Sequence, residues 1–224
     1  YFDWVCDQRT DAAKIDKDIF LISPTGTGKT LAFLLPIILG FTKGTKSVKA
    51  IILVPTRELA LQIESVIRKM KTSYTVCCCY GGHSVRIEKN SLMESPDIIV
   101  ATPGRMADHI SRGNVNVSFV HTVVLDEFDK SLEMGFDEEM EYIMGSLKKV
   151  GKKYLTSATV ADKIPAFVKL KTPIKLKYQS ESIGEKLLQL KLVKSQDKDK
   201  LSTFYELLCN LNNEPCLVFC NHRD

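Results

Sequence analysis

The chain of 224 residues is long enough for one large domain and part of a second. Its content of 44% hydrophobic and 26% charged residues is ordinary for a globular protein. No apolar run approaches the roughly 18 to 20 residues that span a bilayer. The first residues, Tyr1 to Trp4, also lack the basic and apolar segments of a signal peptide. We therefore expect a protein that does not associate with membranes.

The seven cysteines and the net charge of +4 restrict the compartment and the partners. Cys77, Cys78 and Cys79 are consecutive, and neighbours on a strand point to opposite faces, so we expect neither a disulfide framework nor a metal site there. Cys216 and Cys220 lie in another apolar run without a second pair of ligands. Buried, reduced thiols favour the cytoplasm. The mildly basic charge permits a polyanionic partner without identifying one.

The first predicted elements surround a phosphate-binding turn. Trp4 to Ile15 predicts a helix, and an apolar strand from Asp18 then leads into a glycine-containing turn. The turn matches G-x-x-x-x-G-K-[ST] except that Ser23 stands at the first glycine. Its backbone N–H groups and the start of the following helix attract phosphate, whereas a turn without a ligand is the alternative. The expected phosphate ligands are Thr25, Gly26, Thr27, Gly28, Lys29 and Thr30, with Thr30 also on Mg²⁺.

Strands and helices then alternate up to residue 178. Predicted strands cover residues 18–22, 50–54, 75–80, 97–101, 120–125 and 153–156. Predicted helices cover residues 29–39, 57–71, 84–92, 106–110, 136–147 and 162–170. This alternation predicts an α/β fold, with a mainly parallel sheet and helices on both faces.

Polar clusters follow six of these strands. In parallel sheets the ligand crevice lies beyond the carboxyl ends of the strands, so we expect all six clusters on one edge. They comprise residues 23–30, 55–58, 81–82, 102–105, 126–129 and 157–159.

The character of the chain changes after residue 178. Residues 179–186 are polar and predict a linker. Residues 187–224 then predict a strand at 187–193, a helix at 199–211 and a strand at 216–220. We therefore expect a first domain over residues 1–178 and the incomplete beginning of a second α/β domain over residues 187–224.

Two carboxylates, Asp126 and Glu127, end the apolar strand 120–125. A nucleoside triphosphatase needs one carboxylate for hydrated Mg²⁺ and another to orient or deprotonate water. Asp126, directly after the strand, suits the metal, and Glu127 suits the base. An acidic turn that caps the next helix is the alternative, and the upstream phosphate loop argues against it.

Residues 126–129, Asp-Glu-Phe-Asp, are similar to the Asp-Glu-Ala-Asp box of the DEAD-box RNA helicases of superfamily 2. The other matching motifs keep that family's order and spacing and comprise residues 23–30 (motif I), 55–60 (Ia), 81–82, 102–105 (Ib) and 157–159 (III). The resemblance implies a RecA-like domain that hydrolyses ATP with Mg²⁺ to bind and locally unwind RNA. An ATP-gated RNA clamp with little unwinding is the alternative, and a P-loop ATPase that acts on protein or DNA is a third class.

The resemblance also implies roles for single residues. Ser157 and Thr159 would couple the nucleotide site to the interdomain cleft through Asp126 or Asp129. Gln8, the only upstream glutamine, would read adenine, with a surface helix glutamine as the alternative. The implied ligands of the RNA backbone are Pro55, Thr56, Arg57, Gly81, Gly82, Thr102, Pro103, Gly104 and Arg105.

Two departures from the family pattern have consequences. Phe128 stands where the family has alanine, which makes the neighbouring packing unusual and puts its contact with motif III in question. The second-domain arginines of the family are absent from this chain, so we expect the chain alone to hydrolyse ATP weakly. We further expect a monomer, with protein adaptors as possible partners.

Overall fold

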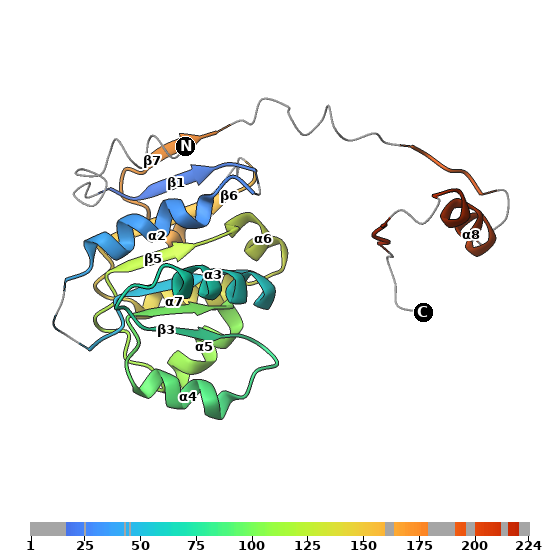
Figure 1. Cartoon of the computed structure of the whole chain (residues 1–224). Helices are drawn as coiled ribbons and strands as arrows, with labels where there is room; N and C mark the ends of the chain where they lie inside the picture. Colours follow the sequence, from blue (N-terminus) through green and yellow to red (C-terminus); the bar gives the residue numbers. More distant parts are fainter. Residues whose placement is uncertain are drawn as a thin grey trace. The chain divides into compact units, whose positions relative to one another are not determined.

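The computed structural model describes residues 17–24, 26–42, 44, 46–159, 164–178, 191–195, 200–211 and 215–219 (Figure 1). The chain forms two compact units, Tyr1–Ser180 and Glu181–Asp224. The predicted helix over residues 4–15 with Gln8, the phosphate ligand Thr25 and the linker 179–186 lie outside the described residues.

A single sheet of seven strands forms the centre of the first unit. The strand order is β3-β4-β2-β5-β6-β1-β7, and every paired strand is parallel. The strands are β1 (Ile19–Ile22), β2 (Ala50–Leu53), β3 (Val76–Cys79), β4 (Ile98–Ala101), β5 (Thr122–Leu125), β6 (Lys152–Ser157) and β7 (Ile174–Lys177). The predicted α/β fold with a parallel sheet is confirmed.

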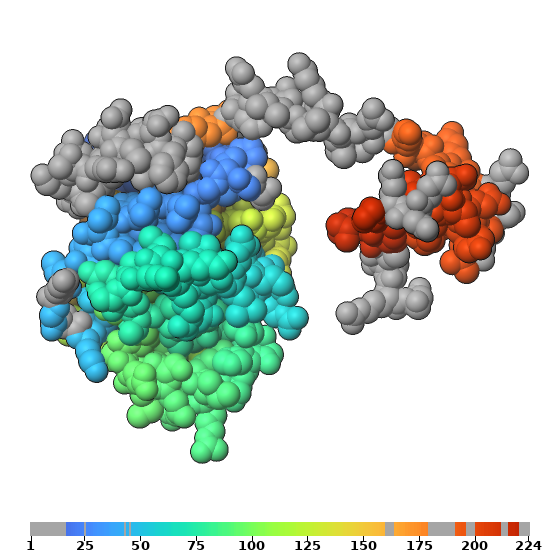
Figure 2. Space-filling view, viewed as in Figure 1, coloured from blue at the N-terminus to red at the C-terminus, as the bar shows by residue number. Residues whose placement is uncertain are grey.

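Helices cover both faces of this sheet. They are α2 (Lys29–Gly40), α3 (Arg57–Lys69), α4 (Val85–Met93), α5 (Pro103–Ser111), α6 (Phe128–Glu133), α7 (Asp137–Ser146) and the 3₁₀ turn η1 (Ala166–Val168). Side chains alternate along each strand, so Ile51 packs in the core with α5, α6 and α7, whereas neighbouring Ile52 packs with α2 and α3. In the space-filling view α2 (blue) and α3 (blue-green) cover the near face (Figure 2).

Four features of the first unit depart from the predictions. The helix expected over 162–170 is wrong in its described part, because Pro165 caps a single 3₁₀ turn and Lys169 ends it with φ 48°. Strand β7 was not predicted, and its half-buried alternation at the sheet edge leaves little apolar signal. Helix α6 was also missed, and α5 begins at Pro103 instead of Met106 because proline suits the first helical turn.

The described part of the second unit contains one helix. Helix α8 (Leu201–Asn210) confirms the predicted helix 199–211. The two flanking strand predictions are wrong for residues 191–193 and 216–219, which form no strand. A strand needs partners that bury its apolar side chains, and Leu217 and Phe219 are exposed here.

The described cysteines are all free thiols. Cys77 and Cys79 are buried on one face of β3, as expected, and Cys78 is half-buried. Cys216 is exposed, so its predicted burial is wrong. Among the described helices, none combines the length and the apolar content that a membrane span requires.

Candidate nucleotide and nucleic-acid site

Six strands end at the same edge of the sheet and bring the polar clusters together, although β6 and β1 extend two residues beyond β5, because Leu125 pairs with Leu155. The strand register pairs Ile22 with Ser157, Leu53 with both Ala101 and Leu125, and Cys79 with Ala101. We call the loops that follow these strand ends the carboxyl edge. The clusters predicted to share one edge therefore do so.

The strand order also divides the carboxyl edge into two halves. The phosphate turn follows β1, residues 157–159 lie at the end of β6, and the Asp126–Glu127 pair follows β5. On the other side of β5 lie the loops after β2, β4 and β3, which carry motif Ia, motif Ib and the Gly81–Gly82 turn. The sequence predicts the shared edge, but not this order along it.

The conformation of the phosphate turn depends on two glycines and on hydrogen bonds between its own side chains. Gly26 and Gly28 have φ angles of 78° and 83°, in the left-handed region that favours glycine, and a Cβ at either position would meet no atom within 4 Å. The Ser23 hydroxyl lies 2.6 Å from the hydroxyl of Thr27, which itself donates to the Pro24 carbonyl. Serine at the first glycine position therefore braces the turn.

Lys29 reaches back across the turn from the first position of α2. Its Nζ donates to the Ser23 carbonyl over 2.7 Å, and the residue is 7% exposed. A buried ammonium group and the free N–H groups at the start of a 12-residue helix both favour an anion in the turn. Thr30 follows on the same helical turn and is half-buried. The turn has the geometry and charge for a phosphate chain.

Asp126 is the buried carboxylate of the site. It is 3% exposed, and the Thr156 hydroxyl donates to its Oδ1. Burial raises the pKa of Asp126 above its usual range, whereas the Thr156 bond and the nearby Lys29 oppose that rise. Thr156 also accepts from the Glu127 N–H over 3.0 Å. One hydroxyl on β6 thus fixes both carboxylate positions at the end of β5.

Glu127 occupies a strained turn between β5 and α6. Its φ of 47° is unusual for a residue with a side chain, and such positions cluster at functional sites. Its Oε2 lies 2.9 Å from the Lys130 Nζ, an ion pair that raises the pKa of Lys130. The carboxylate is therefore held beside Asp126 by the short helix that follows it.

Residues 157–159 bind Asp129 and not Asp126. The Thr159 hydroxyl donates to Asp129 Oδ2 over 2.9 Å, and the Thr159 and Ala158 N–H groups each donate over 3.2 Å. Burial would raise the pKa of Asp129, but bonds from Ser157 and Thr159 outweigh it and lower the pKa. The contact put in question by Phe128 is thus present, because the Phe128 ring is buried in the core.

The other half of the carboxyl edge presents helix starts and a glycine turn. Arg57 opens α3 with a 63% exposed side chain paired to Glu58, and the Thr56 hydroxyl caps that helix by accepting from the Leu59 N–H. Thr102 caps α5 without using its hydroxyl. Gly81 and Gly82 are exposed. Exposed N–H groups, hydroxyls and a guanidinium are donors suited to phosphate oxygens.

The remaining predicted ligands of this half differ in exposure. Pro55 and Pro103 are buried and shape the backbone of their turns. Gly104 is half-buried with open space at its Cβ position. Arg105 has a side chain only 13% exposed, because it points inward to His83 and Glu88.

Sequence reasoning missed Thr156 and Glu88 as parts of the site. Thr156 precedes the predicted motif III and read as an ordinary strand residue, so only the strand register shows that it faces Asp126. Glu88 gave a signal that was overlooked, because it stands four residues before Leu92 on the buried face of α4. A carboxylate at a core position points to a specific role.

The fold and the site define a P-loop domain with strand-end carboxylates, the architecture of a nucleotide hydrolase. The sequence model of the DEAD/DEAH box helicases matches residues 7–167. The chain therefore belongs to the DEAD/DEAH box helicase family.

Relatives and solved structures agree with that assignment. The ATP-dependent RNA helicase drs1 of Schizosaccharomyces pombe is 35% identical over 203 residues, which cover 87% of this chain and 27% of that protein. The DEAD-box ATP-dependent RNA helicase CshA of Geobacillus kaustophilus is 34% identical over 208 residues, which cover 91% of this chain and 44% of that protein. This chain thus spans less than half the length of either relative.

Two solved structures share the fold of this chain. A DEAD box protein from Methanococcus jannaschii superposes with a TM-score of 0.69 and 33% identity, covering 75% of this chain and 47% of that one. The DEAD-box helicase Mss116, solved bound to ssRNA and UDP-BeF, gives a TM-score of 0.69 at 33% identity and covers 78% of this chain and 40% of that one. These likenesses support the RecA-like description of the sheet.

Proposed function

We propose that this chain is the nucleotide-binding part of an ATP-dependent RNA helicase that grips the RNA backbone without reading base sequence. The observation that carries the proposal is the divided carboxyl edge, with a phosphate turn and two carboxylates on one half and exposed backbone-binding groups on the other. The names of the relatives, which are ATP-dependent RNA helicases, support the same reading. The free thiols support a cytoplasmic location.

The residues present fit ATP and Mg²⁺. The open space over Gly26 and Gly28 leaves room for phosphate oxygens beside the backbone, and Lys29 brings a positive charge into that space. Thr30 and Asp126 supply a hydroxyl and a carboxylate oxygen, the hard ligands that Mg²⁺ takes. Bound Mg²⁺ would neutralise charge on the phosphoryl group during transfer.

The chain's own groups divide the work of hydrolysis. Lys29 and the start of α2 hold the phosphates, and Asp126, fixed by Thr156, holds the cation side of the site. Glu127 orients a water and takes its proton as that water attacks the terminal phosphorus, which releases ADP and phosphate. The Lys130 ion pair keeps the Glu127 side chain close to this position.

The exposed half of the carboxyl edge would hold one RNA strand by its sugar-phosphate backbone. Arg57 contributes a guanidinium, Thr102 a free hydroxyl, and Gly81 and Gly82 contribute N–H groups. Contacts of these groups with phosphate and sugar oxygens carry no base identity, so binding should tolerate any sequence.

Steady-state ATPase of the complete two-domain protein, with and without single-stranded RNA, tests the proposal. We expect ATP-selective turnover that RNAs of unrelated sequence stimulate, and separation of a short duplex in the same conditions. The matched variant Glu127→Gln keeps shape and hydrogen bonding, so it should bind ATP and RNA but hydrolyse about 10²-fold more slowly. RNA binding without strand separation would indicate a clamp, and indifference to RNA would overturn the proposal.

A further inference from the structure

Glu88 is a carboxylate in the place of a core side chain. Helix α4 buries only Glu88 and Leu92, which lie one turn apart on the face toward the sheet, and Glu88 is 1% exposed. An unpaired carboxylate at such a position costs several kcal/mol, on the order of the whole stability of a domain. Its partners therefore explain why an acidic residue occupies this position.

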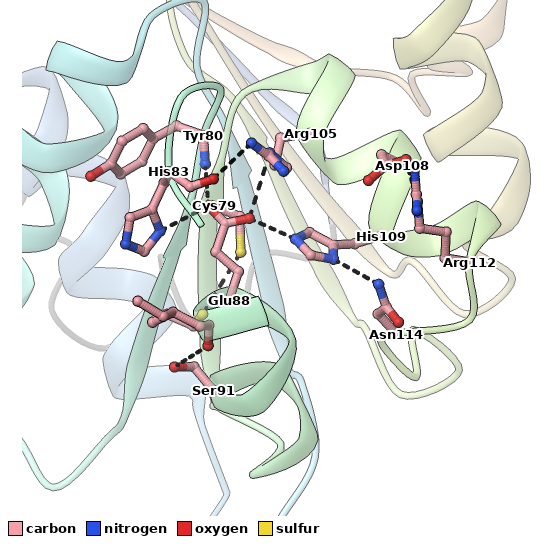
Figure 3. A network of polar contacts seen from close by, with 12 residues as sticks. Cys79, Tyr80, His83, Glu88, Ser91, Arg105, Asp108, His109, Arg112 and Asn114 are labelled. Carbon is pink, nitrogen blue, oxygen red and sulfur yellow. Dashed lines mark hydrogen bonds and ion pairs between the residues drawn. The ribbon is translucent and has the colours of Figure 1, made fainter. Parts of the chain in front are cut away.

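Four donors converge on this one carboxylate (Figure 3). Its Oε1 accepts from the Tyr80 N–H over 3.0 Å and from His83 Nδ1 over 3.1 Å. Its Oε2 lies 2.7 Å from His109 Nε2 and 3.5 Å from Arg105 Nε. Three hydrogen bonds and one ion pair therefore occupy both oxygens of the Glu88 carboxylate.

Three of these donors come from two separate segments of the carboxyl edge, and the fourth, His109, lies in the last turn of α5. Tyr80 and His83 flank the Gly81–Gly82 turn after β3, whereas Arg105 lies in the first turn of α5 after β4. Arg105 Nη2 also donates to the His83 carbonyl over 3.1 Å, so the two loops are joined twice. Within the turn, the His83 N–H donates to the Tyr80 carbonyl over 3.4 Å and the rings of these two residues stack, whereas Gly82, with a φ of 84°, has open space at its Cβ position. Glu88 adds the contacts that join this turn to α4 and α5.

We infer that Glu88 is a positioning residue for RNA binding, which fixes the Gly81–Gly82 turn and the start of α5 as one rigid surface. This inference rests on the proposed function. Donors held in place before the ligand arrives lose less entropy on binding, which raises affinity without a new contact. Arg105 acts through the turn, since its guanidinium is engaged with Glu88 and His83.

A metal site is the competing explanation of the same cluster. Ligand atoms of Cys79, Glu88 and His109 lie within 4.8 Å of one another and resemble a zinc set. However, a cation would have to displace donors from a saturated carboxylate and sit beside the Arg105 guanidinium. The hydrogen bond that the Cys79 thiol makes with Cys77, together with burial, also raises the pKa of the Cys79 thiol, which opposes the thiolate that zinc binds.

The test is the affinity of the 224-residue chain for a fluorescent single-stranded oligouridine, measured by anisotropy in wild type and in Glu88→Gln. Glutamine keeps the size but replaces one oxygen with an NH₂ donor. That donor faces either the Tyr80 N–H and His83 or Arg105 and His109, so in either orientation the link between the turn and the start of α5 is broken. Electrostatics alone predicts tighter binding of a polyanion when a negative charge is removed. Positioning predicts the opposite sign: we expect affinity to fall roughly tenfold, the scale of losing a hydrogen bond to a charged group.

Controls separate positioning from charge and from folding. Glu94→Gln removes the same charge from an exposed position at the end of α4 and should leave affinity unchanged or raise it slightly. The nucleotide affinity of Glu88→Gln should stay within about twofold of wild type, because the phosphate turn lies across β5. If Glu88→Gln does not fold, His83→Ala removes one hydrogen-bond donor to Glu88 at a half-exposed position and should still weaken RNA binding.

The outcomes distinguish this inference from the proposed function. A wild-type chain that binds no RNA would refute the RNA surface itself. A wild-type chain that binds RNA, with Glu88→Gln or His83→Ala binding equally well or better, would overturn only the role of Glu88. A rise in thermal stability on adding zinc that Cys79→Ser abolishes would identify a metal site and would likewise overturn it.

Discussion

Phe128 offers a direct test of how the acidic loop is anchored. The ring is 0% exposed and belongs to the core cluster that also contains Met106, Met140 and Leu155. It is the first residue of α6 and follows Asp126 and Glu127 directly. The family box has alanine here, so Phe128→Ala restores the family residue. It also removes a ring around which this core is packed.

The structure gives the expected size of the effect. Replacing a fully buried phenylalanine with alanine costs about 3 to 5 kcal/mol, because transfer free energy is lost and a cavity remains. In a domain of this size each kcal/mol lowers the midpoint by about 2 to 4 °C, so we expect a fall of roughly 6 to 20 °C. The exposed Phe119, whose ring stacks only under Lys149, is the matched control, and Phe119→Ala should stay within about 1 kcal/mol of wild type.

Thermal and urea unfolding followed by far-ultraviolet circular dichroism measure both variants. A loss below about 1 kcal/mol in Phe128→Ala would mean that the neighbours close around alanine as well as around the ring. Equal losses in Phe119→Ala and Phe128→Ala would also refute the reasoning, since burial would then not explain the difference. In either case the ring would not be what holds the acidic loop against the sheet.

Three further predictions concern the ligands. Lys29→Ala should weaken nucleotide binding about 10-fold or more, measured by calorimetry, and leave the fold intact; unchanged affinity would remove the phosphate-turn assignment. Thr156→Val should raise the pKa of Asp126 further. Binding of Mg²⁺-ATP needs the ionised carboxylate, so its pH profile should move to higher pH, and an unmoved profile would contradict the assignment. Arg57→Ala should lower the salt slope of RNA affinity by about 0.7, the value for one phosphate contact on a single strand. Arg68→Ala, also 63% exposed but in the last turn of α3, should not change it, and equal slopes in the two variants would exclude a phosphate contact by Arg57.

The sign of the Asp126 effect on stability follows from the same shift. Burial raises its folded pKa, so the folded state prefers the protonated acid. The stability that this preference contributes is fully present below the unfolded pKa and is lost as pH rises through the folded pKa. Thr156→Val should therefore make the stability of the chain fall further as pH rises from the unfolded to the folded pKa of Asp126. Asp129 has a lowered folded pKa, so the stability that it contributes is present above its unfolded pKa and is lost as pH falls.

Local sequence patterns predict most of the first unit because its strands are covered on both faces. Runs such as residues 50–53 and 98–101 are continuously apolar and buried, which leaves little ambiguity. Strand β7 was not predicted for the opposite reason, since its exposed lysines alternate with half-buried residues at the edge of the sheet. Helix α6 has six residues, too few for a helical period to show in the sequence. It begins at Phe128, whose ring is buried in the core, and this tertiary contact is not visible in the local sequence.

Some residues of the candidate site can likewise be predicted from the sequence, and others cannot. Residues that present a chemical group next to a glycine or a strand end, such as Lys29 and Asp126, are visible in the sequence. Residues that act by holding other groups are harder to recognise. Thr156 looks like any strand residue until the tertiary contacts are known, and Glu88 shows only as an acidic residue at a buried helix position until its partners are known. A threonine in a strand and a glutamate in a helix are common, so only their partners distinguish them.

Hydrogen-bonded carboxylates lie in both halves of the carboxyl edge, but they have different donors. On the nucleotide side, hydroxyls of Thr156 and Thr159 hold Asp126 and Asp129, and neutral donors leave a carboxylate able to share a cation. On the other side, the Arg105 guanidinium neutralises the charge of Glu88 where an RNA backbone would approach, and two imidazoles add hydrogen bonds. A carboxylate left unpaired there would repel phosphate, whereas a carboxylate fully paired near Mg²⁺ would bind it poorly. The choice of donors around each acid therefore follows from the charge of the ligand that each half would meet.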